Sequence, residues 1–76
     1  MNNSNIIFGT RPVIEAIESG RQIEKIFLKK GLQGEVFFEL NKLIRHYNLP
    51  FQMVPVEKLN RLTRKNHQGV VAIISP

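Results

Sequence analysis

The sequence contains no cysteine, no aspartate and no tryptophan among its 76 residues. Without cysteine it can form neither a disulfide nor a thiolate metal site. Without aspartate and cysteine it cannot assemble a Ser-His-Asp triad or a cysteine nucleophile. The two histidines, His46 and His67, do not occur in a zinc-binding spacing such as H-E-x-x-H. We therefore expect no metal site and no catalysis by this chain alone.

Long apolar runs and phosphate-binding glycine motifs are also absent. No segment approaches the roughly 18 to 20 apolar residues that cross a bilayer, and neither G-x-x-x-x-G-K-[ST] nor G-x-G-x-x-G occurs. The polar start at residues 1–5 lacks the charged and apolar regions of a signal peptide. We therefore expect a cytoplasmic protein that contacts no membrane, with residues 1–5 forming a disordered tail.

Basic residues are concentrated towards the end of the sequence. The formal net charge is +5; residues 1–57 hold seven Lys or Arg and six Glu, whereas residues 58–76 hold four Lys or Arg and no acid. A basic patch confined to one segment favours a polyanion such as RNA, because phosphates attract Lys and Arg whatever the base sequence. A solvated polar face is the alternative that charge alone leaves open.

The hydrophobic pattern predicts helices that alternate with strands. Residues 34–48 give the clearest helix, because six apolar side chains recur on one face: Val36, Phe37, Leu40, Leu43, Ile44 and Tyr47. A helix is also expected at 11–19, with Thr10 or Arg11 as its cap and Gly20 ending it, and a short one at 56–62. Strands are expected at 6–8, 26–28, 51–54 and 70–74. Residues 6–76 should therefore form one α/β domain.

The segment KLNRLTRKNHQG at 58–69 is the strongest candidate binding site. Its cations can hold phosphates, and its amides and imidazole can contact base edges or a ribose 2'-hydroxyl. An ordinary polar loop before a strand is the alternative. The candidate RNA-binding residues in this segment are Arg61, Arg64, Lys65, Asn66, His67, Gln68 and Gly69.

The turn Gly9-Thr10-Arg11 is the second candidate, because a glycine turn that enters a helix exposes backbone N–H groups to an anion. In an all-parallel sheet this turn and the loop at 63–68 would lie at opposite ends of the strands. A single RNA surface therefore requires a mixed sheet. Phe38 lies off the apolar face of its helix. It could stack on a base, and the alternatives are a packing contact at the edge of the core or a contact with a protein.

Two segments resemble a known family. GTRPVIEAIESG at 9–20 and NHQGVVAII at 66–74 resemble the opening and closing signatures of the substrate-binding domain of SpoU-type (TrmH-like) RNA ribose 2'-O-methyltransferases. The resemblance covers nearly the whole chain. It implies a three-layer domain with three helices and a four-stranded mixed sheet, similar to kink-turn-binding ribosomal proteins. By similarity, the first signature includes Gly9, Arg11 and Glu15, and the second includes Asn66, His67, Gln68 and Gly69.

The resemblance also implies a function. The chain would hold structured RNA, 23S ribosomal RNA in the first place and transfer RNA in the second, for a C-terminal knotted catalytic domain of the SPOUT class that this chain lacks. That domain would bind S-adenosylmethionine and methylate a guanosine 2'-hydroxyl, and this chain would bind no cofactor. The rival interpretations are a free-standing kink-turn-type RNA-binding protein, a module that contacts its own catalytic domain, and a small enzyme. We predict that Arg11 and His67 lie on one surface and that Val71 and Ile73 are buried.

Overall fold

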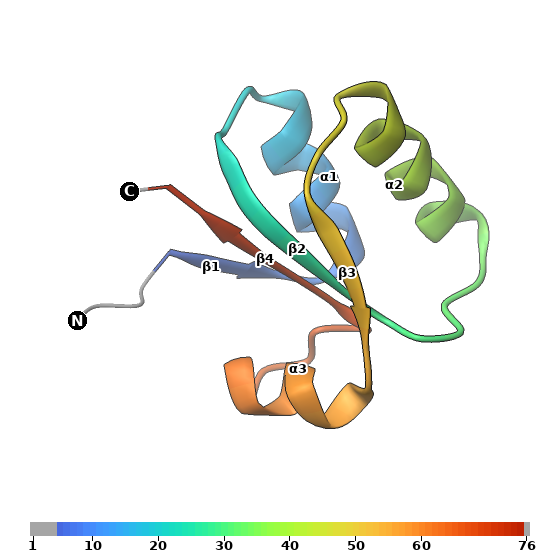
Figure 1. Cartoon of the computed structure of the whole chain (residues 1–76), viewed down its shortest axis with the longest axis vertical. Coiled ribbons are helices and arrows are strands. Elements are labelled where there is room, and N and C mark those ends of the chain that lie inside the picture. Colours follow the sequence, from blue (N-terminus) through green and yellow to red (C-terminus); the bar gives the residue numbers. More distant parts are fainter. Residues whose placement is uncertain (1–4, 76) are drawn as a thin grey trace.

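The computed structural model describes residues 5–75, so the predicted tail lies outside the described residues except for Asn5. Strands and helices alternate along the chain (Figure 1). In order they are β1 (Ile6–Phe8), α1 (Thr10–Glu18), β2 (Ile23–Lys29), α2 (Glu35–His46), β3 (Phe51–Val54), α3 (Val56–Leu62) and β4 (Val70–Ile74). The predicted single α/β domain with three helices and four strands is confirmed.

The sheet is mixed, with the strand order β1-β4-β2-β3. Strand β4 is antiparallel to both β1 and β2, whereas β2 and β3 are parallel. Consequently β1, β2 and β3 all point one way, and their last residues lie at the end of the sheet where β4 begins. We call this the exit end of the sheet. It brings the segments that follow β1 and β2 beside the loop that precedes β4.

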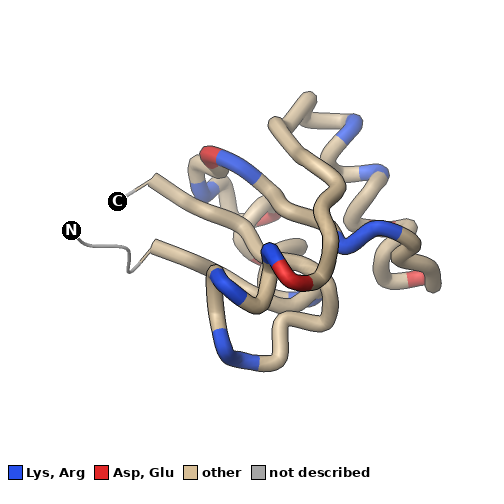
Figure 2. The backbone as a smooth tube through the Cα atoms, turned by 60° about the horizontal axis from the view of Figure 1, so that its bottom comes forward, with Lys and Arg blue, Asp and Glu red and all other residues tan. Residues whose placement is uncertain are grey.

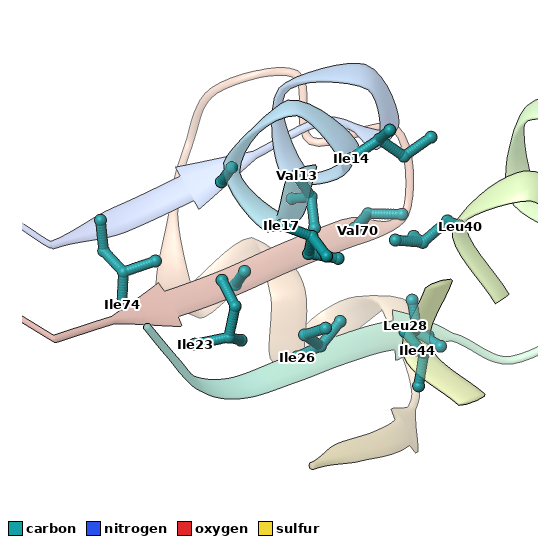
Figure 3. Packing of buried hydrophobic residues seen from close by; sticks show 12 residues of the cluster. Val13, Ile14, Ile17, Ile23, Ile26, Leu28, Leu40, Ile44, Val70 and Ile74 are labelled. Atoms are coloured by element: carbon teal, nitrogen blue, oxygen red, sulfur yellow. The ribbon is translucent and has the colours of Figure 1, made fainter. Parts of the chain in front are cut away.

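Helices cover the sheet on both sides: α1 and α2 lie on one face and α3 lies on the other (Figure 1). The larger core lies between the sheet and the first two helices, where side chains from α1, β2, β4 and α2 point towards one another (Figure 3). The smaller core, beneath α3, contains Phe27, Val54, Leu59 and Val71. The domain therefore has three layers, and only the seven-residue α3 covers its second face.

The predicted boundaries of β1, β3, α3 and β4 are confirmed. Helix α1 begins and ends one residue earlier than predicted, and α2 is shorter at both ends than the predicted 34–48. Strand β2 begins at Ile23 rather than residue 26, because Ile23 pairs with Ile74 on β4. The two charged residues that follow Ile23 interrupt the apolar pattern, so the sequence did not predict this part of the strand. The cap of α1 is Gly9, without a side-chain hydrogen bond, and not Thr10 or Arg11.

Three expected core positions give different outcomes. Val71 is fully buried, as predicted, whereas Ile73 is only half-buried because α3 is too short to cover it completely. Tyr47 was expected on the core face of its helix but is 53% exposed. Tyr47 is the C-cap residue of α2, one position after the last helical residue, so its side chain does not continue the buried face of the helix. Within residues 5–75, no helix is long and apolar enough to cross a membrane.

Candidate functional site

The Gly9 turn and the loop before β4 meet at the exit end of the sheet. The Gly9 N–H donates a hydrogen bond to the Val70 carbonyl oxygen at 2.9 Å. Gly9 has a φ of +96°, and a Cβ placed there would lie 3.5 Å from Oε1 of Gln68. The backbone thus brings together the two segments that carry the sequence signatures, through a glycine whose conformation disfavours any other residue.

His67 is the buried polar side chain of this loop, with 9% exposure. Its Nδ1 accepts a hydrogen bond from the Gly69 N–H at 2.9 Å, and its Nε2 lies 2.7 Å from Oδ1 of Asn60. Because Nδ1 is the acceptor in the first bond, Nε2 carries the hydrogen of the neutral ring and donates it to Asn60. The ring therefore ties α3 to the turn that starts β4. We call this arrangement the His67 clamp: His67, Asn60 and Gly69.

The prediction that Arg11 and His67 lie on one surface is wrong for their side chains. Nη1 of Arg11 lies 4.0 Å from Oε1 of Glu39 on α2, whereas the His67 ring bonds to α3 on the opposite face of the sheet. Both ring nitrogens of His67 are engaged within the chain. The ring positions the loop, and a direct RNA contact by His67 stays a prediction with no free nitrogen to support it.

The remaining polar side chains of the loop face solvent. Arg64, Lys65 and Asn66 are exposed, and the Lys65 N–H donates to Oγ1 of Thr63 at 3.1 Å, which closes a tight turn. Gln68 is also exposed and has a φ of +54°. In the described part of the chain the one ion pair joins Arg11 to Glu39, so the loop cations are not neutralised by carboxylates. They remain available to an external anion.

The three remaining predicted site residues lie on helices α1 and α3, and one of them is next to the loop. Arg61 is exposed in the last turn of α3, next to the loop, and Thr10 is half-buried at the first position of α1. Glu15 is exposed farther along α1, where it lines a shallow hollow with Ile7 and Arg21. The structure therefore joins Arg61 to the loop and separates Glu15 from it.

Sequence reasoning missed two lysines at the end of β2. The Lys29 N–H donates to the Gly69 carbonyl oxygen at 2.8 Å, so the strand end touches the turn of the loop. Lys29 and Lys30 are both exposed. In the sequence they stand far from residues 64–68, and only the antiparallel pairing of β2 with β4 brings them together.

The sequence is similar to those of known proteins over nearly its whole length. Residues 6–76 match the family described as RNA 2'-O ribose methyltransferase substrate binding. The chain belongs to this family. The substrate-binding domain is 37% identical over 71 residues to a protein of Staphylococcus haemolyticus (strain JCSC1435), covering 93% of this chain and 28% of that protein. It has the same identity to a protein of Staphylococcus aureus (strain COL), of which it covers 29%. The names of both assign them to the TrmH family of tRNA/rRNA methyltransferases.

Solved structures share the fold at low sequence identity. A Bacillus halodurans protein of unknown function superposes with a TM-score of 0.74 at 19% identity, covering 93% of this chain and 72% of that one. An archaeal translation termination factor superposes with a TM-score of 0.65 at 18% identity, covering 96% of this chain and 21% of that one. At these identities the similarity shows the fold alone.

Proposed function

We propose that the substrate-binding domain holds structured RNA for a TrmH-type methyltransferase domain in the same polypeptide. The family match over residues 6–76 carries the proposal. The domain spans 28% of the Staphylococcus haemolyticus relative, which leaves most of that protein's length for other parts. In this chain the loop of Arg64 to Gln68 supplies the exposed groups that such a role requires.

Each group in the loop has a chemical task in this proposal. Arg61, Arg64 and Lys65 hold phosphates, whose contacts orient the RNA without reading its sequence. Asn66 and Gln68 carry amides that can donate and accept hydrogen bonds at base edges or at a ribose 2'-hydroxyl. The Gly9 turn borders the loop beside Gln68, and Thr10 and Arg11 follow it at the start of α1. Because the His67 clamp already fixes the turn, the loop loses little conformational freedom on binding.

We propose the following reaction for the whole protein, and the family match supports its class. The catalytic domain would bind S-adenosylmethionine and transfer its methyl group to a guanosine 2'-hydroxyl of 23S ribosomal RNA, or of transfer RNA. The present chain takes no part in the transfer. Its contribution is to place the target ribose within reach of that domain, which is a matter of position rather than chemistry.

An amide NMR titration of the 76-residue chain with a stem-loop of ribosomal RNA, at low and raised salt, tests the proposal. Salt-sensitive shifts should concentrate at residues 9–11 and 64–69. A DNA stem-loop of the same sequence is the control, because it lacks the 2'-hydroxyl and should shift Asn66 and Gln68 less. An RNA titration that leaves both segments unshifted at low salt would refute RNA binding.

Exposed apolar side chains favour a second candidate function, a module that contacts its own catalytic domain. Phe51 and Met53 are 45% and 41% exposed on β3, which is an edge strand, and Phe38 on α2 is 64% exposed. Such side chains are enriched at protein interfaces. If the RNA leaves the loop unshifted while the separately expressed catalytic domain shifts β3, this second function is supported.

A further inference from the structure

We infer that Lys29 and Lys30, at the end of β2, form a second set of phosphate contacts in the RNA site. This inference rests on the proposed RNA-binding function and extends it to residues that neither family signature contains. The ligand class is the phosphodiester backbone of a folded RNA.

The end of β2 is in direct contact with the loop. The Lys29 N–H donates to the Gly69 carbonyl oxygen at 2.8 Å, and the Gly69 N–H is held by His67. A Cβ at Gly69 would lie 2.8 Å from Cδ2 of Leu32 and 3.2 Å from Cβ of Lys29. The chain around Lys29 therefore packs against the turn too closely for any side chain to stand between them.

Lys29 points to the same side of the sheet as the His67 clamp. Lys29 is paired with Val54 on β3, and Val54 is buried under α3. Paired residues on neighbouring strands point to the same face. Lys29 therefore faces the α3 side, where the His67 ring bonds to Asn60.

Positive charge continues across this face of the domain. Nζ of Lys58 lies 5.4 Å from the ring centroid of Phe27, which is two residues before Lys29 on the same face of β2. Figure 2, which brings the α3 side forward, shows several Lys and Arg segments on this side and one acidic segment among them. Lys58 thus adds a further cation to the α3 face, beside the strand that ends in Lys29.

Lys29 and Lys30 are not neutralised by carboxylates within residues 5–75. Both are exposed, and the one ion pair of residues 5–75 involves neither of them. Arg11, by contrast, pairs with Glu39 on the other side of the sheet. The end of β2 therefore places two exposed lysines without a carboxylate partner in residues 5–75 beside the loop, and Lys29 faces the α3 side. Cations on both sides of the Gly69 turn can hold two separate stretches of backbone, as a folded RNA presents them.

The test compares two double substitutions with the same change in charge. Lys29→Gln with Lys30→Gln removes the proposed contacts. Arg21→Gln with Lys25→Gln removes one cation just before β2 and one near its start, away from the loop. Affinity for a fluorescein-labelled RNA stem-loop is measured by anisotropy over a series of salt concentrations. Two lost phosphate contacts should reduce the slope of log affinity against log salt by about 1.4 to 1.8, whereas the control should keep the slope of the unmodified chain. Amide spectra of both variants check that the fold is retained.

The outcomes separate this inference from the proposed function. If Lys29→Gln with Lys30→Gln leaves the slope unchanged, or if both pairs reduce it equally, the lysines make no specific contact and the inference is wrong while RNA binding stands. If the unmodified chain shows no affinity for the RNA at low salt, the proposed function itself is wrong. A selective loss at Lys29 and Lys30 supports both.

Discussion

Nε2 of His67 lies 2.7 Å from Oδ1 of Asn60, and this contact joins α3 to the loop that carries the exposed cations. The other ring nitrogen accepts the Gly69 N–H at 2.9 Å. One buried ring therefore forms hydrogen bonds with both the Asn60 side chain of α3 and the Gly69 backbone N–H of the turn. The position of the loop relative to α3 therefore depends on this ring.

Replacing His67 with alanine should destabilise the domain. The substitution leaves the buried Gly69 N–H without its acceptor and removes a packed ring, at a cost of about 1 to 3 kcal/mol in the free energy of unfolding. A chain of this length has about 4 to 11 kcal/mol in total, so the loss should be plain in urea denaturation followed by circular dichroism. Asn66→Ala, in the exposed residue beside it, is the control and should change the stability by less than about 0.5 kcal/mol.

A double-mutant cycle can isolate the contact with Asn60. Asn60 is exposed, so Asn60→Ala should cost less than His67→Ala, because water can replace the lost partner. If the 2.7 Å contact is formed in solution, the two substitutions together should cost less than the sum of the single ones, by about 0.5 kcal/mol or more. Strict additivity would show that the two side chains do not interact.

Gly69→Ala and Gly31→Ala form a matched pair. Both glycines have a φ of +85°, but a Cβ at Gly31 meets nothing within 4 Å, whereas one at Gly69 comes within 2.8 Å of Leu32. Gly31→Ala should therefore show only the conformational cost of about 1 to 2 kcal/mol. Gly69→Ala should add about 1 to 3 kcal/mol from overpacking, measured by the same denaturation experiment. If both substitutions reduce the free energy of unfolding equally, the side chains of Leu32 and Lys29 can move aside at little cost.

The sequence predicted the strands and helices well where the residue types mark their ends. Strand β3 lies between Pro50 and Pro55, and β4 starts directly after Gly69, so both strands were predicted with the observed boundaries. The first residues of β2 were missed because Glu24 and Lys25 break the apolar pattern there. The antiparallel partner of that segment is 48 to 51 residues away in the sequence, and local patterning cannot reveal it.

The candidate site was only partly predictable for the same reason. The cations Arg64 and Lys65 can be recognised from the sequence, because residues 58–76 contain no acidic side chain that would balance their charge. The role of His67 cannot be recognised from the sequence, because the burial of its ring depends on how α3 packs against the loop. Lys29 joins the site only through the pairing of β2 with β4. Residue types thus indicated the chemistry, whereas the topology decided which residues meet.

Leu59 holds α3 on the sheet and should be the most sensitive position of the smaller core. Its side chain is fully buried among Phe27, Val54 and Val71. Leu59→Ala should cost about 2 to 5 kcal/mol in the free energy of unfolding. Phe38→Ala, at a 64% exposed position on α2, is the control and should cost less than about 0.5 kcal/mol. Since the His67 clamp starts from α3, Leu59→Ala should also shift the amide resonances of the loop, and an unshifted loop would argue against this coupling.

Neutralising Arg64 and Lys65 tests the loop itself. Arg64→Gln with Lys65→Gln removes two exposed cations without touching a buried side chain, so the fold should be retained. If both hold phosphates, affinity for the RNA stem-loop should fall and the slope of log affinity against log salt should decrease by about 1.4 to 1.8. Lys42→Gln with Arg45→Gln, on the exposed side of α2, gives the same change in net charge and is the control. If the control reduces the slope as much as the loop variant does, the RNA responds to the overall charge of the domain, and the loop is not its site.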